Sequence, residues 1–379
     1  MFIGIAVIAV LLLGISARRY VHGLTLVVRA ADLHGVVRRL ADLDTVPIRE
    51  RLVDAPLRAG SMRARVYSPL GTARQTVLLV SGLHPAGIDE PRLVSLARKL
   101  AETNVTVVTP EIPQLSRFEV TPAVTDRIEE SAVWLATESG LAPSGRIGLM
   151  GISFSGGLAV VAAGRPSVRH HLLYVFSFGG HNDLPRVLEY FCRGIEGDRM
   201  TRGLPAPHDY GVAIVLLNVV ERLVPPEQIA PLREAVRRFL WASYLDRVDK
   251  PRAQHEFAAL RDLARTLPEP AATLLQYVND RDVGHLGPHL RPYIGFYAAA
   301  PPLSPARSPM PSAPVYLLHG RDDNVIPAAE SRHLADRLRG HVMVRLLVTD
   351  LISHAEADQP AHITDVLKLA GFWGELLAR

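Results

Sequence analysis

The stretch Arg146–Gly157, RIGLMGISFSGG, contains the pattern on which the prediction of the fold depends. The apolar run Ile147–Met150 predicts a buried strand, and a Gly/Ser-rich turn follows it at once. If a helix begins near Ser155, then Ser153 sits on a tight strand-to-helix turn, which requires small residues on both sides. The Ser153 hydroxyl would project above the sheet beside a helix N-terminus, where developing negative charge is favoured. We therefore expect Ser153, rather than Ser155, to be a nucleophile. The alternative is an ordinary Gly/Ser turn.

Strands and helices alternate on both sides of this turn. We expect strands at 46–55, 62–69, 76–82, 105–112, 146–151, 171–178, 315–320 and 341–350. Helices are expected at about 91–103, 124–138, 155–164, 328–339 and 360–378. This alternation predicts an α/β fold with a mostly parallel central sheet covered by helices on both faces.

The alternation stops after the sixth expected strand. Helical patterns occupy 184–195, 211–223, 226–247, 252–266 and 270–278, and a Pro-rich stretch at 301–314 closes the block. We interpret 181–314 as an inserted helical cap. Its apolar run 210–220 predicts a helix that either lines a hydrophobic acyl-binding cavity or packs within the cap.

Two further motifs follow the last two expected strands. LLHGRDDNVIP at 317–327 places Asp322 and Asp323 after one strand, and DLISHAEAD at 350–358 places His354 after the next. A serine nucleophile needs an imidazole base, and the base needs a carboxylate to orient it. The chain order Ser153, then an aspartate, then His354 is the order expected for one sheet topology. A solvated acidic turn and a surface histidine are the non-functional alternatives.

Together these motifs resemble the α/β-hydrolase fold, with features nearest to its dienelactone-hydrolase and serine-peptidase-like branch. GISFSGG resembles the nucleophile elbow, although Ser155 stands where the general pattern has glycine. The resemblance implies a core at 46–180 and 315–379. It implies that the catalytic acid stands four residues after His319, which assigns Asp323 and keeps Asp322 in reserve. It also implies an oxyanion hole formed by the backbone N–H groups of Phe154 and Leu83.

Other polar residues are candidates for the substrate pocket. His84 follows Leu83 in SGLHPAGIDE (81–90) and either lines the site or is a structural loop histidine. His181 and Asp183, after the sixth strand, either contact substrate or cap the next helix. His285 and His289 in VGHLGPH are spaced like metal ligands, but the Gly-Pro between them argues against a regular helix. We expect a loop role there, with no metal and no cofactor.

The N-terminus carries a separate signal. Phe2–Ala17 is uncharged, and Arg18 and Arg19 follow it. Sixteen apolar residues make a helix of about 24 Å, slightly short of a bilayer core of roughly 30 Å. We expect residues 1–19 to anchor the chain in a membrane, with residues 20–45 forming an amphipathic helical linker on the membrane surface or on the body. A signal peptide and a buried helix are the alternatives. The arginines place the body in the cytoplasm by the positive-inside rule, with export as the alternative.

Composition excludes several classes of protein. The net charge is +4, and the basic residues are scattered without a Lys/Arg block, which argues against nucleic-acid binding. One cysteine, Cys192, excludes an internal disulfide and a thiolate metal cluster. The sequence leaves the oligomeric state open.

The expected function is that of a serine hydrolase acting on a carboxylic ester, with a lipid ester or another small amphipathic acyl compound as substrate. A peptidase or acyltransferase with the same triad is the first alternative. A membrane-tethered binding protein without catalysis is the second.

Overall fold

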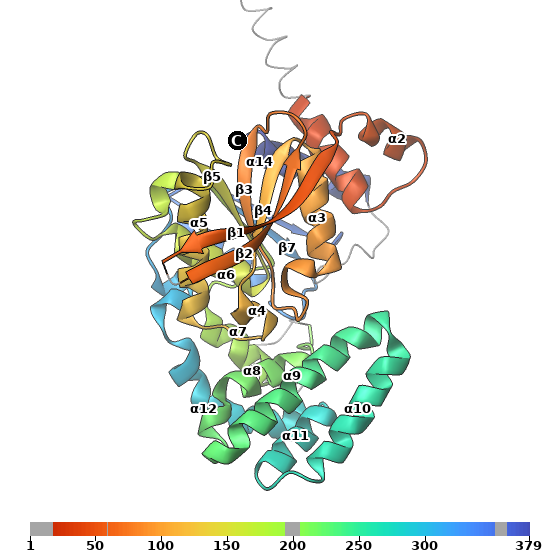
Figure 1. Ribbon diagram of the computed structural model, residues 1–379, viewed down its shortest axis with the longest axis vertical. Coiled ribbons are helices and arrows are strands. Elements are labelled where there is room, and N and C mark those ends of the chain that lie inside the picture. Colours follow the sequence, from red (N-terminus) through yellow and green to blue (C-terminus); the bar gives the residue numbers. More distant parts are fainter. Residues whose placement is uncertain (1–17, 59, 194–204, 353–361) are drawn as a thin grey trace, which may run out of the picture.

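The computed structural model describes residues 18–58, 60–193, 205–352 and 362–379 (Figure 1). Its strands form an eight-stranded sheet in the order β1-β2-β4-β3-β5-β6-β7-β8. β2 runs antiparallel to β1 and β4, and the remaining neighbours are parallel. The strands are β1 Ile48–Leu57, β2 Gly60–Pro69, β3 Gln75–Val80, β4 Val105–Pro110, β5 Ile147–Ile152, β6 Leu172–Phe178, β7 Val315–Gly320 and β8 Val344–Thr349. The predicted α/β class and mostly parallel sheet are confirmed.

The central strands are buried on both faces. Every residue of β3, β4 and β7 is buried, as their continuous apolar and β-branched sequences require. β1, at one edge, is mostly exposed or half-buried.

Helices cover the two faces of this sheet. α3 (Pro91–Glu102), α14 (Ile363–Leu377) and a helix at 18–30 pack on one face, where their apolar side chains form one buried cluster with β3 and β6. α5 (Pro122–Thr137), α6 (Phe154–Ala163) and α13 (Ala329–Leu338) pack on the other. α4 (Pro113–Ser116) is a single turn after β4.

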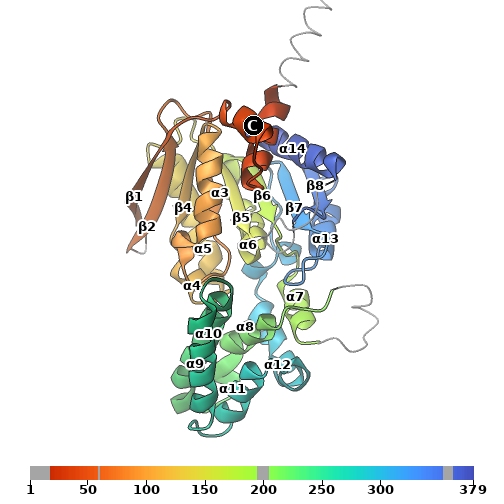
Figure 2. The ribbon, with the colours of Figure 1, turned by 90° about the vertical axis from the view of Figure 1, so that its right-hand side faces the viewer.

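The helical cap lies beyond one end of the sheet (Figures 1 and 2). It consists of α7 Leu184–Phe191, α8 Tyr210–Val219, α9 Pro226–Val248, α10 Lys250–Ala264, α11 Ala271–Asn279 and α12 Val283–Ala298. Buried side chains of the cap belong to the same apolar cluster as α5 and α6. The cap and core therefore share one hydrophobic core.

α12 corrects the expectation that VGHLGPH is an irregular loop. The helix runs through Pro288 and Pro292, both of which are exposed. Leu286, Leu290, Ile294 and Ala298, each four residues apart, are buried against the cap. Burial of this stripe overrides the unfavourable helix propensity of the two prolines.

The expected amphipathic linker at 20–45 contains two helices rather than one continuous helix. The helix at 18–30 ends before Asp32, and α2 (Val36–Asp42) begins after Gly35, with positive φ angles at Asp32 (48°) and Gly35 (81°). Residues 1–17, most of the predicted anchor, lie outside the described residues. In the part of the chain that is described, no helix combines the length and apolar character needed to cross a membrane.

Candidate active site

Ser153 is the single residue between β5 and α6. Its backbone has φ 56° and ψ −130°, a conformation that a residue with a side chain adopts only when its surroundings impose it. The Ser153 N–H donates to the Phe178 carbonyl at 2.7 Å, which ties the turn to the end of β6. The strained turn predicted at this position is therefore present.

The residues around Ser153 are small because the backbone is crowded. A Cβ added to Gly151 would lie 2.1 Å from the Ser155 carbonyl oxygen, and one on Gly156 would lie 2.6 Å from Ser177 Oγ. Ser155 is fully buried within α6, whereas Ser153 retains 9% exposure and lines a cavity. Only Ser153 of this pair is placed to meet a substrate.

Asp323 lies on the loop after β7 and is 2% exposed. Its Oδ1 accepts the N–H groups of Val325 and Ile326 at 2.8 and 2.9 Å. Two such donors favour the ionised carboxylate. The other oxygen, Oδ2, is 3.4 Å from Nε2 of His319. Asp322, the reserve candidate, is exposed and lines the cavity.

The loop that follows β6 lies between the Ser153 turn and Asp323. Gly179, directly after β6, donates its N–H to the Leu318 carbonyl of β7, and a Cβ there would stand 3.4 Å from Asp323 Oδ2. β5, β6 and β7 are neighbouring parallel strands. The residues that follow their C-terminal ends, Ser153, Gly179 and Asp323, therefore lie side by side at one end of the sheet. His354 lies outside the described residues.

The predicted oxyanion donors flank Ser153. Phe154 is the first residue of α6, so its N–H has no acceptor within the helix. Leu83 lies on the loop after β3 and lines the same cavity as Ser153. In that loop a Cβ on Gly82 would be 3.4 Å from Cβ of Ser153, so the loop backbone runs close to Ser153.

His84 links this loop to the cap. Its Nδ1 accepts the Ala86 N–H at 3.2 Å, and its ring meets the ring of Tyr244 in α9 edge-on at 4.5 Å. Burial lowers the pKa of His84 to about 4, so the ring is neutral near pH 7. His84 therefore lines the cavity and also contacts the cap through Tyr244. It has both the pocket position and the structural role that the sequence left open.

His181 and Asp183 are placed elsewhere, contrary to the pocket role considered for them. His181 is fully buried behind α6, where its Nε2 pairs with the Leu303 carbonyl at 2.8 Å. Asp183 accepts the Arg186 N–H as the N-cap of α7 and pairs with Arg307. Neither belongs to the described residues around the cavity. The helix-capping alternative thus holds for Asp183.

The cavity that contains Ser153 has a volume of about 1000 Å³ and lies between core and cap. Its apolar wall combines core and cap side chains: Leu83, Phe118, Phe154, Phe178, Ile214, Leu240 and Val325. Tyr210 and Ile214 of α8 face it, while most of α8 is buried in the cap. The run 210–220 therefore lines the cavity with two residues and packs within the cap along most of its length, while acyl binding stays a prediction.

Charged side chains line the rest of the cavity, and no motif in the sequence predicts them. Arg92 pairs with Glu90 at 2.7 Å, and Arg281 pairs with Asp209 at 2.7 Å. Lys99 lies further along α3, and burial lowers its pKa. Among the described residues, His84 and His208 also line the cavity, so each places an imidazole in the same cavity as Ser153.

The strand order, the antiparallel second strand and the strained serine between β5 and α6 define an α/β-hydrolase fold. The sequence matches no family model, and no curated protein matches it significantly.

Solved structures resemble the chain at low identity. An esterase from Pyrobaculum calidifontis is 15% identical with a TM-score of 0.46, covering 95% of this chain and 91% of its own. A structure described as an arylesterase is 14% identical with a TM-score of 0.48, covering 90% and 89%. A lipase in an open form is 16% identical with a TM-score of 0.44, covering 87% and 99%. These likenesses concern the fold alone.

Proposed function

We propose that this protein is a serine hydrolase that cleaves carboxylic esters through an acyl-enzyme on Ser153. The observation that carries the proposal is the strained Ser153 at a cavity of about 1000 Å³ with a largely apolar wall. A strained backbone at a serine whose hydroxyl can reach a cavity is a feature of functional sites rather than of ordinary turns.

Each residue has a role in the proposed reaction. His354 removes the Ser153 proton as the hydroxyl oxygen attacks the acyl carbonyl, and Asp323 orients and stabilises the imidazolium. The N–H groups of Phe154 and Leu83 stabilise the oxyanion. His354 then gives its proton to the leaving alcohol, and water hydrolyses the acyl-enzyme by the reverse sequence.

The chain length after β8 supports His354 as the base. Thr349 ends β8 and pairs with Gly320, the last residue of β7, so both strands end at the edge that carries Asp323. The five residues from Thr349 to His354 span at most about 18 Å. This short connection supports a position for His354 near the end of the sheet that carries Asp323.

The walls of the cavity support an amphipathic acyl substrate. Apolar side chains of core and cap suit an acyl chain, and the charged pairs at Arg92 and Arg281 suit a polar leaving group. The proposal includes a membrane anchor at residues 1–19 with the body in the cytoplasm. The uncharged run Phe2–Ala17 and the arginines that follow it support this arrangement.

Hydrolysis of p-nitrophenyl esters from acetate to dodecanoate, in detergent, tests the proposal. Wild type is expected to prefer medium or long chains. Ser153→Ala is expected to lose about 10⁴-fold or more of kcat. Ser243→Ala, which removes a hydroxyl from the same cavity, is expected to retain activity.

Variants at histidines identify the base. His354→Ala is expected to be as inactive as Ser153→Ala. The serine hydroxyl is a poor nucleophile without the base, and the base has no nucleophile to activate without the hydroxyl. Loss of activity in His208→Ala but not in His354→Ala would contradict the assigned base. A folded wild type that hydrolyses amides, or transfers the acyl group to an alcohol faster than to water, would replace the esterase by a peptidase or acyltransferase. No turnover of any of these would favour a binding protein.

A further inference from the structure

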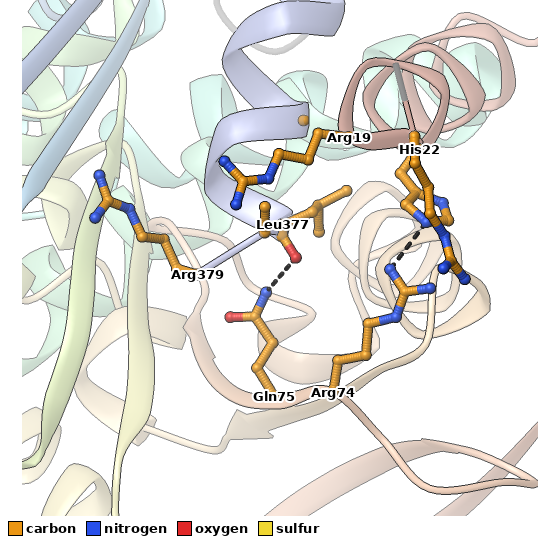
Figure 3. A pocket seen from close by; sticks show the side chains of 9 residues that line it. Arg19, His22, Arg74, Gln75, Leu377 and Arg379 are labelled. Atoms are coloured by element: carbon orange, nitrogen blue, oxygen red, sulfur yellow. Dashed lines mark hydrogen bonds between the residues drawn. The ribbon is translucent and has the colours of Figure 1, made fainter. Parts of the chain in front are cut away.

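A second, smaller pocket lies away from the cavity that contains Ser153. It has a volume of about 400 Å³ and is bounded by the start of the helix at 18–30, the start of β3 and the end of α14 (Figure 3). Nine described residues line it: Arg18, Arg19, His22, Arg74, Gln75, Gly374, Leu377, Ala378 and Arg379. Four of these are arginines from three separate parts of the chain, which makes the pocket basic.

The arginine from the middle of the chain is held in place by its neighbours. Arg74 Nη1 donates to His22 Nε2 at 2.9 Å, and His22 Nδ1 pairs with Asp44 Oδ2 at 2.6 Å. Because arginine only donates, His22 accepts at Nε2 and donates from Nδ1. This series of hydrogen bonds, from Asp44 through His22 to Arg74, holds the Arg74 guanidinium in place. Figure 3 shows the bond between Arg74 and His22.

The described acidic side chains that pair with residues of this pocket contact His22 and Arg379, not Arg18 or Arg19. Asp44 bonds to His22, and Glu375 lies 3.7 Å from Arg379, whose Nε donates to Tyr316 Oη at 2.8 Å. Among the described residues, the side chains of Arg18 and Arg19 have no acidic partner within 4 Å. Figure 3 shows the Arg19 side chain extending over Leu377. Guanidinium groups without an acidic partner are suited to bind a phosphate, whose oxygens accept several N–H donors at once.

The surroundings indicate a phosphate attached to a lipid. Arg18 follows directly on the uncharged run Phe2–Ala17. α2 lies near the same end of the molecule, opposite the cap (Figure 1). Five aliphatic side chains in and beside α2 are exposed to solvent. These are 41–83% exposed: Leu33, Val36, Val37, Leu40 and Leu43. Exposed aliphatic residues at the same end of a molecule as unpaired arginines suit an anionic bilayer surface.

We propose that this pocket binds the phosphate of an anionic phospholipid, with Arg19 and Arg74 as its ligands. The site is independent of Ser153, so its test uses no activity assay. A lipid bound to the folded state raises the melting temperature by mass action.

The test measures the melting temperature of the full chain in detergent micelles that contain phosphatidylglycerol or, at equal mole fraction, phosphatidylcholine. Phosphatidylglycerol is expected to raise the melting temperature of wild type by at least about 2 °C over phosphatidylcholine. Arg74→Gln is expected to lose this shift. Arg19→Gln, which changes an exposed side chain without an acidic partner among the described residues, provides a second variant in case Arg74→Gln folds poorly. Arg261→Gln, an exposed arginine of α10 with the same charge change, is expected to keep the shift.

Three results would overturn the proposal. The first is no difference between the two lipids with wild type. The second is an equal shift in wild type, Arg74→Gln, Arg19→Gln and Arg261→Gln, which would indicate a general effect of charge. The third is a shift with inorganic phosphate at matched ionic strength but none with phosphatidylglycerol, which would assign the pocket to a free anion.

Discussion

At the scale of single residues, the elbow depends on the absence of side chains around Ser153. Gly151 approaches the Ser155 carbonyl so closely that a Cβ would stand 2.1 Å from its oxygen. Because glycine has no side chain, the backbone can approach this closely, and the chain passes from strand to helix through the single residue Ser153. The hydroxyl is thereby presented at the sheet edge, while Ser155 is buried.

Gly151→Ala is therefore expected to destabilise the protein by about 1–3 kcal/mol and to remove the proposed esterase activity. Urea unfolding and ester hydrolysis measure the two effects. Gly71→Ala is the matched control, because no heavy atom lies within 4 Å of the position a Cβ would take there. Equal stability and activity of the two variants would show that the turn tolerates a Cβ.

His84 makes stability depend on pH. Burial lowers its folded-state pKa to about 4 from an ordinary value of 6.5, so the unfolded chain binds the proton more readily. The stabilisation is fully present above about pH 6.5 and is lost as the pH falls toward 4. A shift of this size corresponds to about 3 kcal/mol at most, and partial solvent exposure reduces it.

His84→Gln is expected to flatten this dependence. The difference in unfolding free energy between pH 4.5 and pH 7 should be smaller in the variant than in wild type, as measured by urea titration at both values. An unchanged difference would mean that another group carries the pH dependence.

At the scale of elements, two helices approach through glycine. The helix at 18–30 crosses α14 so closely that a Cβ on Gly374 would lie 2.4 Å from the Arg19 carbonyl oxygen. Gly371, one turn earlier in α14, has only an ordinary contact at 3.7 Å with Tyr20. The same substitution is thus expected to have opposite effects at the two positions.

Gly374→Ala should lower the free energy of unfolding by about 1–3 kcal/mol because it separates the helices. Gly371→Ala should be neutral or stabilise by up to about 1 kcal/mol, since alanine favours the helix. Thermal unfolding of both variants beside wild type checks this. A destabilised Gly371→Ala with an unchanged Gly374→Ala would contradict the described helix crossing.

Local pattern predicted most elements and failed where packing decides. Alternating strands and helices identified all eight strands of the described sheet, and the GISFSGG and HGRDDNVIP motifs located Ser153 and Asp323. The prolines of α12 hid a helix that exists because its buried stripe packs in the cap. Positive φ angles at Asp32 and Gly35 break a segment that its apolar pattern presented as one helix. His181 could not be placed, because only the fold shows that it lies behind α6.

At the scale of the whole molecule, the cavity is built from both core and cap. It extends from Ser153 along α3, where the seven-residue separation of Arg92 and Lys99 corresponds to roughly 10 Å, and reaches Ala30. The opposite end of the same N-terminal helix lines the basic pocket. One helix therefore connects the cavity to the end of the molecule that we propose faces a membrane.

Filling the cavity is expected to change the preferred chain length. Ile214 of α8 is 3% exposed and lines the cavity. Ile214→Trp should lower kcat/KM for decanoate esters roughly tenfold or more relative to acetate esters, since long chains lose their space. Ile214→Val is the conservative control, expected to keep the preference of wild type. An unchanged preference in Ile214→Trp would place the acyl chain elsewhere.

The most direct test of the account is to identify the residue modified by a fluorophosphonate in the folded protein. The detergent-solubilised full chain is labelled, digested and analysed by mass spectrometry, with heat-denatured protein as the control. The account predicts a single adduct on Ser153, formed only in the folded protein and absent from Ser153→Ala. An adduct on Ser155 or another residue, or no adduct on active folded protein, would contradict it.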